Sequence, residues 1–232
     1  MKKVIFRLLS LAMIVSLFMT SCKKDDETKE LTLSQLSVTM VHDDTLTITA
    51  NQKVEWASKD EFVAKISSDG KITARHIGET SVTATIDGQQ KECKVTVKPV
   101  YNTYSEPVLN FDLAKSEIKT KEKRPLVEET DTSLTYSDKT KYLLTYLFSK
   151  TTSKFRAVYL YLNDITTSQA SQIADFQTER YQPITIDKNT YTYYMINSDK
   201  METATMAVST SFKTQKLQLN AIIVYEKIPV VN

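Results

Sequence analysis

VAKISSDGKITARHIGETSVTATIDGQQKECKVTV, residues 63–97, decides the fold of the first half of this 232-residue chain. The stretch contains Asp69-Gly70 and Asp87-Gly88, each lying between segments in which apolar and polar residues alternate. A period of two is typical of strands, and an Asp-Gly pair suits the positive φ angles of a tight hairpin turn. The stretch therefore predicts two β-hairpins.

The alternation continues towards the N-terminus. Residues 45–49 (TLTIT) alternate strictly, and Val54 and Trp56 share one face of the next short segment. With the hairpins, about seven short strands fit into this part of the chain, the number found in an antiparallel immunoglobulin-like sandwich. Pro99 ends the last strand because proline cannot donate to a ladder. We therefore expect an Ig-like β-sandwich over residues 31–100.

The same segments resemble a known family. The strings VEWAS (54–58), VAKI (63–66), DGKITA (69–74), GETSVTAT (78–85) and CKVTV (93–97) are similar to the group 2 bacterial immunoglobulin-like (BIG2) domain. The resemblance covers roughly residues 30–98. It implies an extracellular module that spaces, stiffens or binds, and it implies no catalysis. His42-Asp43-Asp44 departs from the pattern, since the family has a glycine-containing turn there.

Four features of this domain have simple interpretations. Trp56 is expected as a core anchor between the two sheets, with an exposed stacking platform as the alternative. Cys93 alternates with apolar residues and is expected to be a buried, inert thiol. His42-Asp43-Asp44 is expected to be a solvated loop, because neighbouring side chains in a turn diverge and do not form a metal site. His76 is expected at the surface.

Residues 1–21 predict a signal peptide. Lys2, Lys3 and Arg7 precede an apolar run from Leu8 to Met19 that is too short to cross a bilayer. The ending FMTSC (18–22) resembles the lipobox of bacterial lipoproteins. That resemblance implies that Cys22 becomes the lipidated N-terminus; the alternative is a secretory signal with an incidental cysteine.

Residues 22–30 predict a tether between the lipid and the first domain. The segment KKDDE (23–27) resembles the lysine-plus-acid tag of Bacteroidetes lipoproteins that are sent to the outer surface of the outer membrane. Any such charge run also makes a solvated tether, and both interpretations can hold together. The resemblance implies a lipid-anchored outer-membrane protein that faces the cell surface.

Charge and composition exclude several kinds of function. The chain has 30 basic and 28 acidic residues, and removal of residues 1–21 takes away three basic ones, which leaves a net charge of −1. No basic stripe remains to predict a nucleic-acid partner. All three glycines lie at positions 70, 78 and 88. Residues 101–232 therefore contain no glycine-rich phosphate loop.

The second half, residues 101–232, predicts an α+β domain with a mostly antiparallel sheet and one helix, so the chain as a whole is mainly β. A capping box at residues 166–169 (TTSQ) begins the helix, which ends near Arg180-Tyr181 before Pro183. Runs that are apolar on both faces predict central strands covered on two sides. Strands are expected at 108–111, 142–148, 155–162, 191–196, 204–212 and 217–225.

Two segments of this half resemble a C-terminal domain that follows Ig-like modules in Bacteroidetes lipoproteins. They are EPVLNF (106–111) near its start and FQTERY (176–181) on the expected helix. The resemblance implies a location and a fold, and it implies no particular activity.

The second half lacks the residues of the commonest catalytic sites. It contains neither histidine nor cysteine, so no Ser-His-Asp or Cys-His site can be built from it. Two carboxylates would suffice for a glycosidase, and Asp175 and Glu179 lie one helical turn apart. We interpret both as solvated charges. Glu128-Glu129 is expected in a loop. No catalytic residue, metal site or cofactor is therefore predicted, and the chain is expected not to be an enzyme.

Tyrosines are the leading candidates for a ligand site. All twelve lie after residue 100. Pairs two positions apart on the face of a strand would form an aromatic platform if their faces coincide and lie open. The alternative is that they line the face covered by the helix. The candidate ligand-binding residues are Tyr142, Tyr146, Tyr159, Tyr161, Tyr191 and Tyr193.

Three functions remain open from the sequence. The first is a non-enzymatic surface lipoprotein whose second domain binds a glycan or protein in adhesion, displayed by an Ig-like spacer. The second is a structural accessory subunit of a cell-envelope assembly. The third is a carboxylate-dependent glycan hydrolase. Membrane contact would come through the lipid at Cys22, and the sequence leaves the oligomeric state open.

Overall fold

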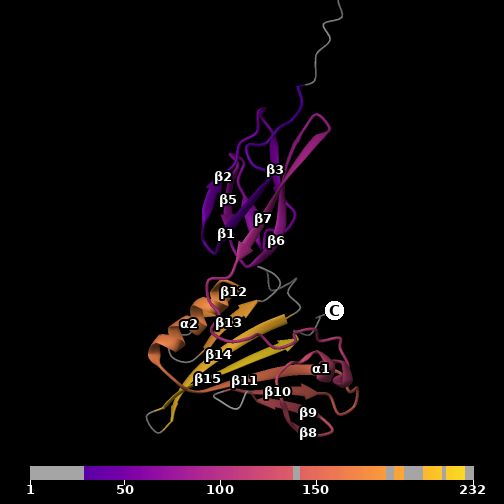
Figure 1. The fold of residues 1–232 in the computed structure, drawn as a ribbon, viewed down its shortest axis with the longest axis vertical. Coiled ribbons are helices and arrows are strands. Elements are labelled where there is room, and N and C mark those ends of the chain that lie inside the picture. The colour runs from indigo at the N-terminus through magenta and orange to yellow at the C-terminus, as the bar shows by residue number, and fades with distance from the viewer. Residues whose placement is uncertain (1–28, 138–141, 187–190, 196–205, 216–217, 228–232) are drawn as a thin grey trace, which may run out of the picture. The chain divides into compact units, whose positions relative to one another are not determined.

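The computed structural model describes residues 29–137, 142–186, 191–195, 206–215 and 218–227. The described residues are mainly β, with three sheets and two helices (Figure 1). They form two hydrophobic clusters, one within residues 38–97 and one within residues 104–225. The expected fold class is confirmed.

The first cluster lies in a seven-stranded Ig-like sandwich, as predicted. One sheet has the order β1 (Ser37–Val41), β7 (Gln89–Lys98), β6 (Gly78–Ile86) and β3 (Glu55–Ser58). The other has the order β2 (Thr45–Thr47), β5 (Lys71–Ala74) and β4 (Ala64–Ile66). The expected all-antiparallel arrangement is wrong at one edge, because β1 pairs parallel with β7. No hairpin joins these two strands, so no turn forces them to be antiparallel.

Both Asp-Gly pairs make the hairpin turns that the sequence predicts. Asp87 and Gly88 have φ angles of 45° and 77° between β6 and β7. Gly70 has a φ angle of 82° between β4 and β5, and a Cβ there would lie 2.3 Å from the carbonyl oxygen of Ile48. Asp43 has a φ angle of 65°, so an aspartate adopts the left-handed conformation in the turn where the family has a glycine.

Cys93 is fully buried, as expected, and burial raises the pKa of its thiol. Trp56 is only partly buried and packs against the margin of the cluster, which places it further out than the predicted core anchor. The surface position expected for His76 is wrong. Its side chain is buried, its Nδ1 lies 2.6 Å from the carbonyl oxygen of Phe62, and its ring stacks on Phe62 at 4.0 Å.

The second cluster lies against an eight-stranded antiparallel sheet. The strand order is β12 (Gln182–Ile186), β13 (Tyr191–Met195), β14 (Met206–Gln215), β15 (Gln218–Lys227), β11 (Phe155–Ile165), β10 (Tyr142–Phe148), β9 (Ser133–Ser137) and β8 (Leu126–Glu129). Strands β10 and β11 are interior strands, as predicted. Three strands were not expected: β8, β9 and β12. Residues 108–111, expected as a strand, are irregular.

The predicted helix is α2 (Thr167–Thr178). Its capping box forms as expected: the Gln169 amide donates to the Thr166 hydroxyl at 3.1 Å, and the Thr166 amide donates to Gln169 Oε1 at 2.9 Å. A second helix, α1 (Lys115–Lys121), was not predicted, because only Ile118 in its seven residues is buried and no apolar stripe marks it. No described helix is long and apolar enough to cross a bilayer.

One face of the eight-stranded sheet is buried along most of the described strands, whereas on the other face burial is confined to isolated residues such as Thr135 and Ser211. Ile118 of α1 and Ile173 and Phe176 of α2 belong to the same cluster as Tyr146 and Leu160, so both helices pack on this covered face. On the opposite face, which we call the open face, side chains such as Leu143 are exposed or half-buried. The expectation that β10 and β11 are covered on both sides is therefore wrong.

Candidate binding site

The six candidate tyrosines do not lie on one face of the sheet. In β10 the inward residues are Tyr142, Leu144, Tyr146 and Phe148, and β11 alternates in the same way around Leu160. Tyr159 and Tyr161 pair with Thr145 and Leu143 and therefore lie on the open face. The alternation of each strand was visible in the sequence, but which face of it would be covered was not.

Tyr146 is a buried structural residue and cannot contribute to an open platform. Its side chain is 0% exposed. The hydroxyl donates to Glu122 Oε2 at 2.6 Å and accepts the Val108 amide at 2.7 Å. Burial, followed by the hydrogen bond to Glu122, raises the pKa of Tyr146 well above its ordinary value. Tyr146 therefore fixes the segment before α1 and the residue after α1 to the sheet.

Tyr142 also lies on the covered face, but it is half-buried at the rim of the cluster. Its hydroxyl donates to the carbonyl oxygen of Thr103 at 3.2 Å. The ring thus faces the chain segment that leads into this half of the protein and borders a cavity described below.

Tyr159 and Tyr161 form a partly exposed pair on the open face. Their ring centroids are 6.3 Å apart and their planes differ by 16°. Partial burial, followed by the proximity of Tyr159, raises the pKa of Tyr161. The residues that pair with them across the sheet carry no charge: Leu143, Thr145, Ile222 and Val224. The directly paired positions are therefore uncharged, whereas the exposed Glu226 lies on the same face one row away, paired with Ala157.

The backbone register continues from this pair to β13. Tyr159 pairs with Val224, which pairs with Ser209, which pairs with Tyr193. The row of Tyr161 continues in the same way through Ile222 and Ser211 to Tyr191. The backbone positions of Tyr159 and Tyr193 thus lie on one row of paired residues across the sheet, and those of Tyr161 and Tyr191 lie on the adjacent row. The side chains of Tyr191 and Tyr193 lie outside what the structure describes.

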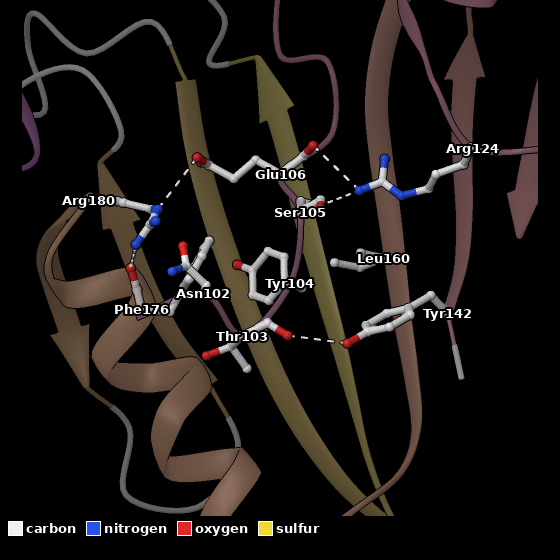
Figure 2. Close-up of a pocket in the computed structure, with 10 residues that line it drawn as sticks. All are labelled: Asn102, Thr103, Tyr104, Ser105, Glu106, Arg124, Tyr142, Leu160, Phe176 and Arg180. Atoms are coloured by element: carbon white, nitrogen blue, oxygen red, sulfur yellow. Dashed lines mark hydrogen bonds and ion pairs between the residues drawn. The ribbon is translucent and has the colours of Figure 1, made fainter. Parts of the chain in front are cut away.

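A cavity of about 440 Å³ opens on the covered face, between the segment that follows residue 100, the end of α2 and the strands β10 and β11 (Figure 2). Volumes of this size are typical of small-molecule sites. The segment after residue 100 supplies half of its lining, including Asn102, Tyr104 and Glu106. Tyr142, Leu160, Phe176 and Arg180 supply most of the remainder.

Charged side chains at the cavity are held by the protein itself. Glu106 accepts a hydrogen bond from the Tyr181 hydroxyl, and its Oε2 lies 3.5 Å from Arg180 Nε. Arg180 lies over the ring of Phe176, 3.5 Å from its centroid. At the other end, Arg124 contacts Glu122 Oε1 at 2.8 Å and donates to the carbonyl oxygen of Ser105. Figure 2 shows Glu106 between the two guanidinium groups.

A buried hydrogen-bond network lies next to this cavity. The hydroxyls of Tyr104 and Tyr225 are 2.8 Å apart, and Gln177 Nε2 lies 3.3 Å from Tyr104 and 2.6 Å from Thr210. Burial is the main reason that the pKa values of Tyr104 and Tyr225 are raised well above ordinary values. These tyrosines are therefore neutral and structural.

The carboxylates considered for hydrolysis have other roles. Glu179, expected to be solvated, is 1% exposed, and it accepts the amides of Val100 and Tyr101 at 2.9 and 3.1 Å as well as a bond from Arg180. Asp175 is half-buried and Glu129, expected in a loop, is on β8 with lysine partners. We find no group of three metal-ligating side chains within the described part of the chain.

A second cavity, of about 470 Å³, contains both Glu106 and Glu122. Glu122 Oε1 accepts the amides of Lys123 and Arg124, and its Oε2 accepts from Tyr146. The carboxylate is therefore saturated by protein donors and is poorly placed to act on a glycosidic bond. Cys22, the expected lipidation site, lies outside the described residues.

Of the residues that line this cavity, Tyr142 alone was predicted from the sequence as a ligand-binding residue, and it was predicted as part of an open platform. Glu106 and the Arg180-Tyr181 pair were noted as parts of two segments that resemble a C-terminal domain, and the pair was also noted as the expected end of the helix. Their separation along the chain hides the contact, and nothing in local periodicity signals that the irregular segment after residue 100 returns to the end of α2. Gln177 is buried next to Phe176 on α2, and the apolar pattern of the helix does not indicate this.

Residues 27–97 match the family model of the bacterial Ig-like domain (group 2), which confirms the resemblance of the first half. An alpha-L-arabinofuranosidase of Bifidobacterium longum subsp. longum is 33% identical over 88 residues, which is 37% of this chain and 8% of that enzyme. The chain thus spans a small fraction of the curated relative that it matches.

Two solved structures are similar over most of the chain, at low TM-scores. The extracellular cadherin domains 1–5 of protocadherin gamma B2 match with a TM-score of 0.27 and 14% identity, over 86% of this chain and 39% of that one. A SusE-like surface-located polysaccharide-binding protein from the heparin utilisation locus of Bacteroides thetaiotaomicron matches with a TM-score of 0.23 and 9% identity, over 84% of this chain and 34% of that one.

Proposed function

We propose that this protein is a non-enzymatic, lipid-anchored surface protein that binds a glycan on the open face of its eight-stranded sheet. In this proposal Cys22 carries the lipid, residues 22–30 form a tether, and the Ig-like domain (31–100) displays the second domain (101–232). The outer surface of the outer membrane is the proposed location. The polysaccharide-binding and arabinofuranosidase names among the similar proteins fit a glycan context but do not carry the proposal.

One observation supports the binding proposal: Tyr159 and Tyr161 form a nearly parallel, partly exposed pair whose direct neighbours across the sheet are uncharged. Exposed aromatic surfaces mark interaction sites, and tyrosine keeps a wet hydroxyl beside an apolar ring. Sugar rings have apolar faces and polar edges. They can therefore lie on such rings while their hydroxyls meet the Thr145 and Ser209 positions of the same rows.

The register extends this proposed surface to Tyr191 and Tyr193, whereas Tyr142 and Tyr146 are not part of it. In this proposal the six candidate tyrosines are therefore reduced to four: Tyr159, Tyr161, Tyr191 and Tyr193. Substitution of Tyr146 should lower the free energy of unfolding and leave glycan binding on the open face unchanged.

A glycan array with the chain from residue 23 onward tests the proposal. We expect binding to at least one glycan, lost in the double variant Tyr159→Ala/Tyr161→Ala and retained in Leu36→Ala. Leu36 is 65% exposed in the Ig-like domain and controls for the loss of an exposed apolar side chain. If no glycan binds and an envelope protein co-purifies with the chain, the accessory-subunit function replaces this one.

The hydrolase remains a weaker candidate, although one cavity holds two carboxylates. Both Glu106 and Glu122 are already bound by protein donors. Release of reducing sugar from a bound glycan, abolished by Glu106→Gln, would contradict the non-enzymatic proposal.

A further inference from the structure

The cavity in Figure 2 is lined by polar and charged side chains, and it is separate from the surface proposed for glycan binding on the open face. It lies on the covered face of the sheet. Its walls are the segment after residue 100, Arg124 before β8, the end of α2, and strands β10 and β11. Tyr159 and Tyr161 lie on the other face. A ligand of the cavity would therefore contact different residues from a ligand of the open face.

Two polar side chains at the cavity have no hydrogen-bond partner among the described residues. They are the Asn102 amide and the Ser105 hydroxyl, both exposed and both in the lining. Figure 2 shows Asn102 between Arg180 and Tyr104. An amide offers two donors and an acceptor, and a hydroxyl offers a donor and an acceptor. These groups match a ligand that carries several hydroxyls.

The charged groups of the cavity are held in place by one another, and carboxylates outnumber guanidinium groups by three to two. Arg124 and Arg180 have three carboxylate partners in all: Glu106, Glu122 and Glu179. An anionic ligand would therefore gain little from the guanidinium groups and would face the half-exposed carboxylate of Glu106. The same bonds hold Glu106 in place before a ligand arrives, which lowers the entropy lost on binding.

The ring of Tyr142 forms a further part of the cavity lining. Tyr142 is half-buried, and its bond to the Thr103 carbonyl oxygen fixes the ring at the edge of the cavity (Figure 2). The hydroxyl is engaged by the protein, and the ring borders the cavity. A volume of about 440 Å³ with one ring and several polar groups suits a small polyhydroxylated molecule.

We propose that this cavity binds one neutral sugar unit, with Asn102 and Ser105 bonding its hydroxyls, Glu106 accepting from a further hydroxyl, and the Tyr142 ring against its apolar face. The site is distinct from the open face and would seat a chain end or a branch, where the open face would hold a longer stretch.

Protein-detected NMR with the chain from residue 23 onward tests the proposal. The probes are the methyl glycosides of glucose, mannose and galactose, with glucuronate as the anionic comparison. We expect saturable shifts of the Asn102 side-chain amide and the Arg124 Nε–H signal with at least one neutral glycoside. Asn102→Ala should weaken that binding about tenfold, the size expected for a lost hydrogen bond or two.

Asn163→Ala is the matched control, because Asn163 is exposed on β11 and outside the cavity lining. Tyr159→Ala/Tyr161→Ala should also leave the cavity signals unchanged, so the failure of one site is distinguishable from the failure of the other. The proposal is overturned if no neutral glycoside gives saturable shifts, if the shifts persist at full affinity in Asn102→Ala and Ser105→Ala, or if glucuronate binds more tightly than every neutral probe.

Discussion

Glu106 Oε2 lies 3.5 Å from Arg180 Nε, although the two residues are 74 positions apart in the chain. The same carboxylate accepts a hydrogen bond from Tyr181. This contact joins the irregular segment after residue 100 to the end of α2. It brings together the two segments that resemble a C-terminal domain and forms one edge of the cavity.

Glu106→Gln should lower the free energy of unfolding by about 1–2 kcal/mol, because a charge-assisted contact to the buried Arg180 is lost. Chemical denaturation measures the change. Glu128→Gln is the control: Glu128 is exposed on β8, and its replacement should have no measurable effect. Equal stabilities for both variants would mean that the contact adds nothing to the fold.

Tyr146→Phe should destabilise the protein by about 1–3 kcal/mol, since it leaves the Val108 amide and a Glu122 oxygen without their partner. Tyr136→Phe is its matched control. Tyr136 is also buried, and its hydroxyl has no hydrogen-bond partner among the described residues, so its removal should be neutral or stabilising. A larger loss in Tyr136→Phe than in Tyr146→Phe would contradict this assignment.

Gly70→Ala should cost about 2–4 kcal/mol, because a positive φ is combined with a clash at the Ile48 carbonyl oxygen. Gly88→Ala meets no atom within 4 Å and should cost only the conformational strain, about 1–2 kcal/mol. The melting temperatures of the two variants distinguish the cost of the clash in Gly70→Ala from the cost of backbone strain alone in Gly88→Ala. Similar melting temperatures would show that the Ile48 contact relaxes freely.

His76 should make stability depend on pH between 6.5 and 4. Burial is the main cause that lowers its pKa to about 4, while the unfolded chain protonates near 6.5. The unfolded state therefore binds more protons in this window, so stability is full above pH 6.5 and falls as the pH drops, by about 3 kcal/mol at most. His76→Gln should flatten this part of the curve. An NMR titration of His76 near pH 6.5 would refute the assignment.

Cys22→Ala should move the protein from the membrane fraction to the soluble fraction of the cell envelope, because the acyl chains proposed on this residue would supply the anchor. Fractionation followed by immunoblotting measures the shift. Cys93→Ala is the control, since Cys93 is buried in the Ig-like domain and cannot carry lipid. Unchanged partitioning of Cys22→Ala would remove the anchor from the proposal.

Local pattern predicted much of the fold. The Asp69-Gly70 and Asp87-Gly88 turns, the strand over 142–148 and the capping box at Thr166 all form where they were expected, because each depends on neighbours a few residues away. Strands β8 and β12 were missed because acidic residues in one and Pro183 in the other weaken the strand pattern.

The candidate site was predicted less well. Tyr142 and Tyr159 look alike in alternating strands, and only the register shows that they lie on opposite faces of the sheet. Glu179 was expected to be a solvated charge, but its carboxylate is buried and accepts hydrogen bonds from the amides of Val100 and Tyr101. That role needs a chain segment that arrives from far away in sequence.

The sequence by itself determined the strand alternation, the tight turns, the Ig-like family match and the lack of histidine and cysteine in the second half, since these depend on residue type and short spacing. The tertiary structure decided which tyrosines are buried, which charges are paired and where a cavity opens. Those properties depend on which face of each strand the helices cover, and on contacts such as Glu106 with Arg180 that close only when distant segments pack together.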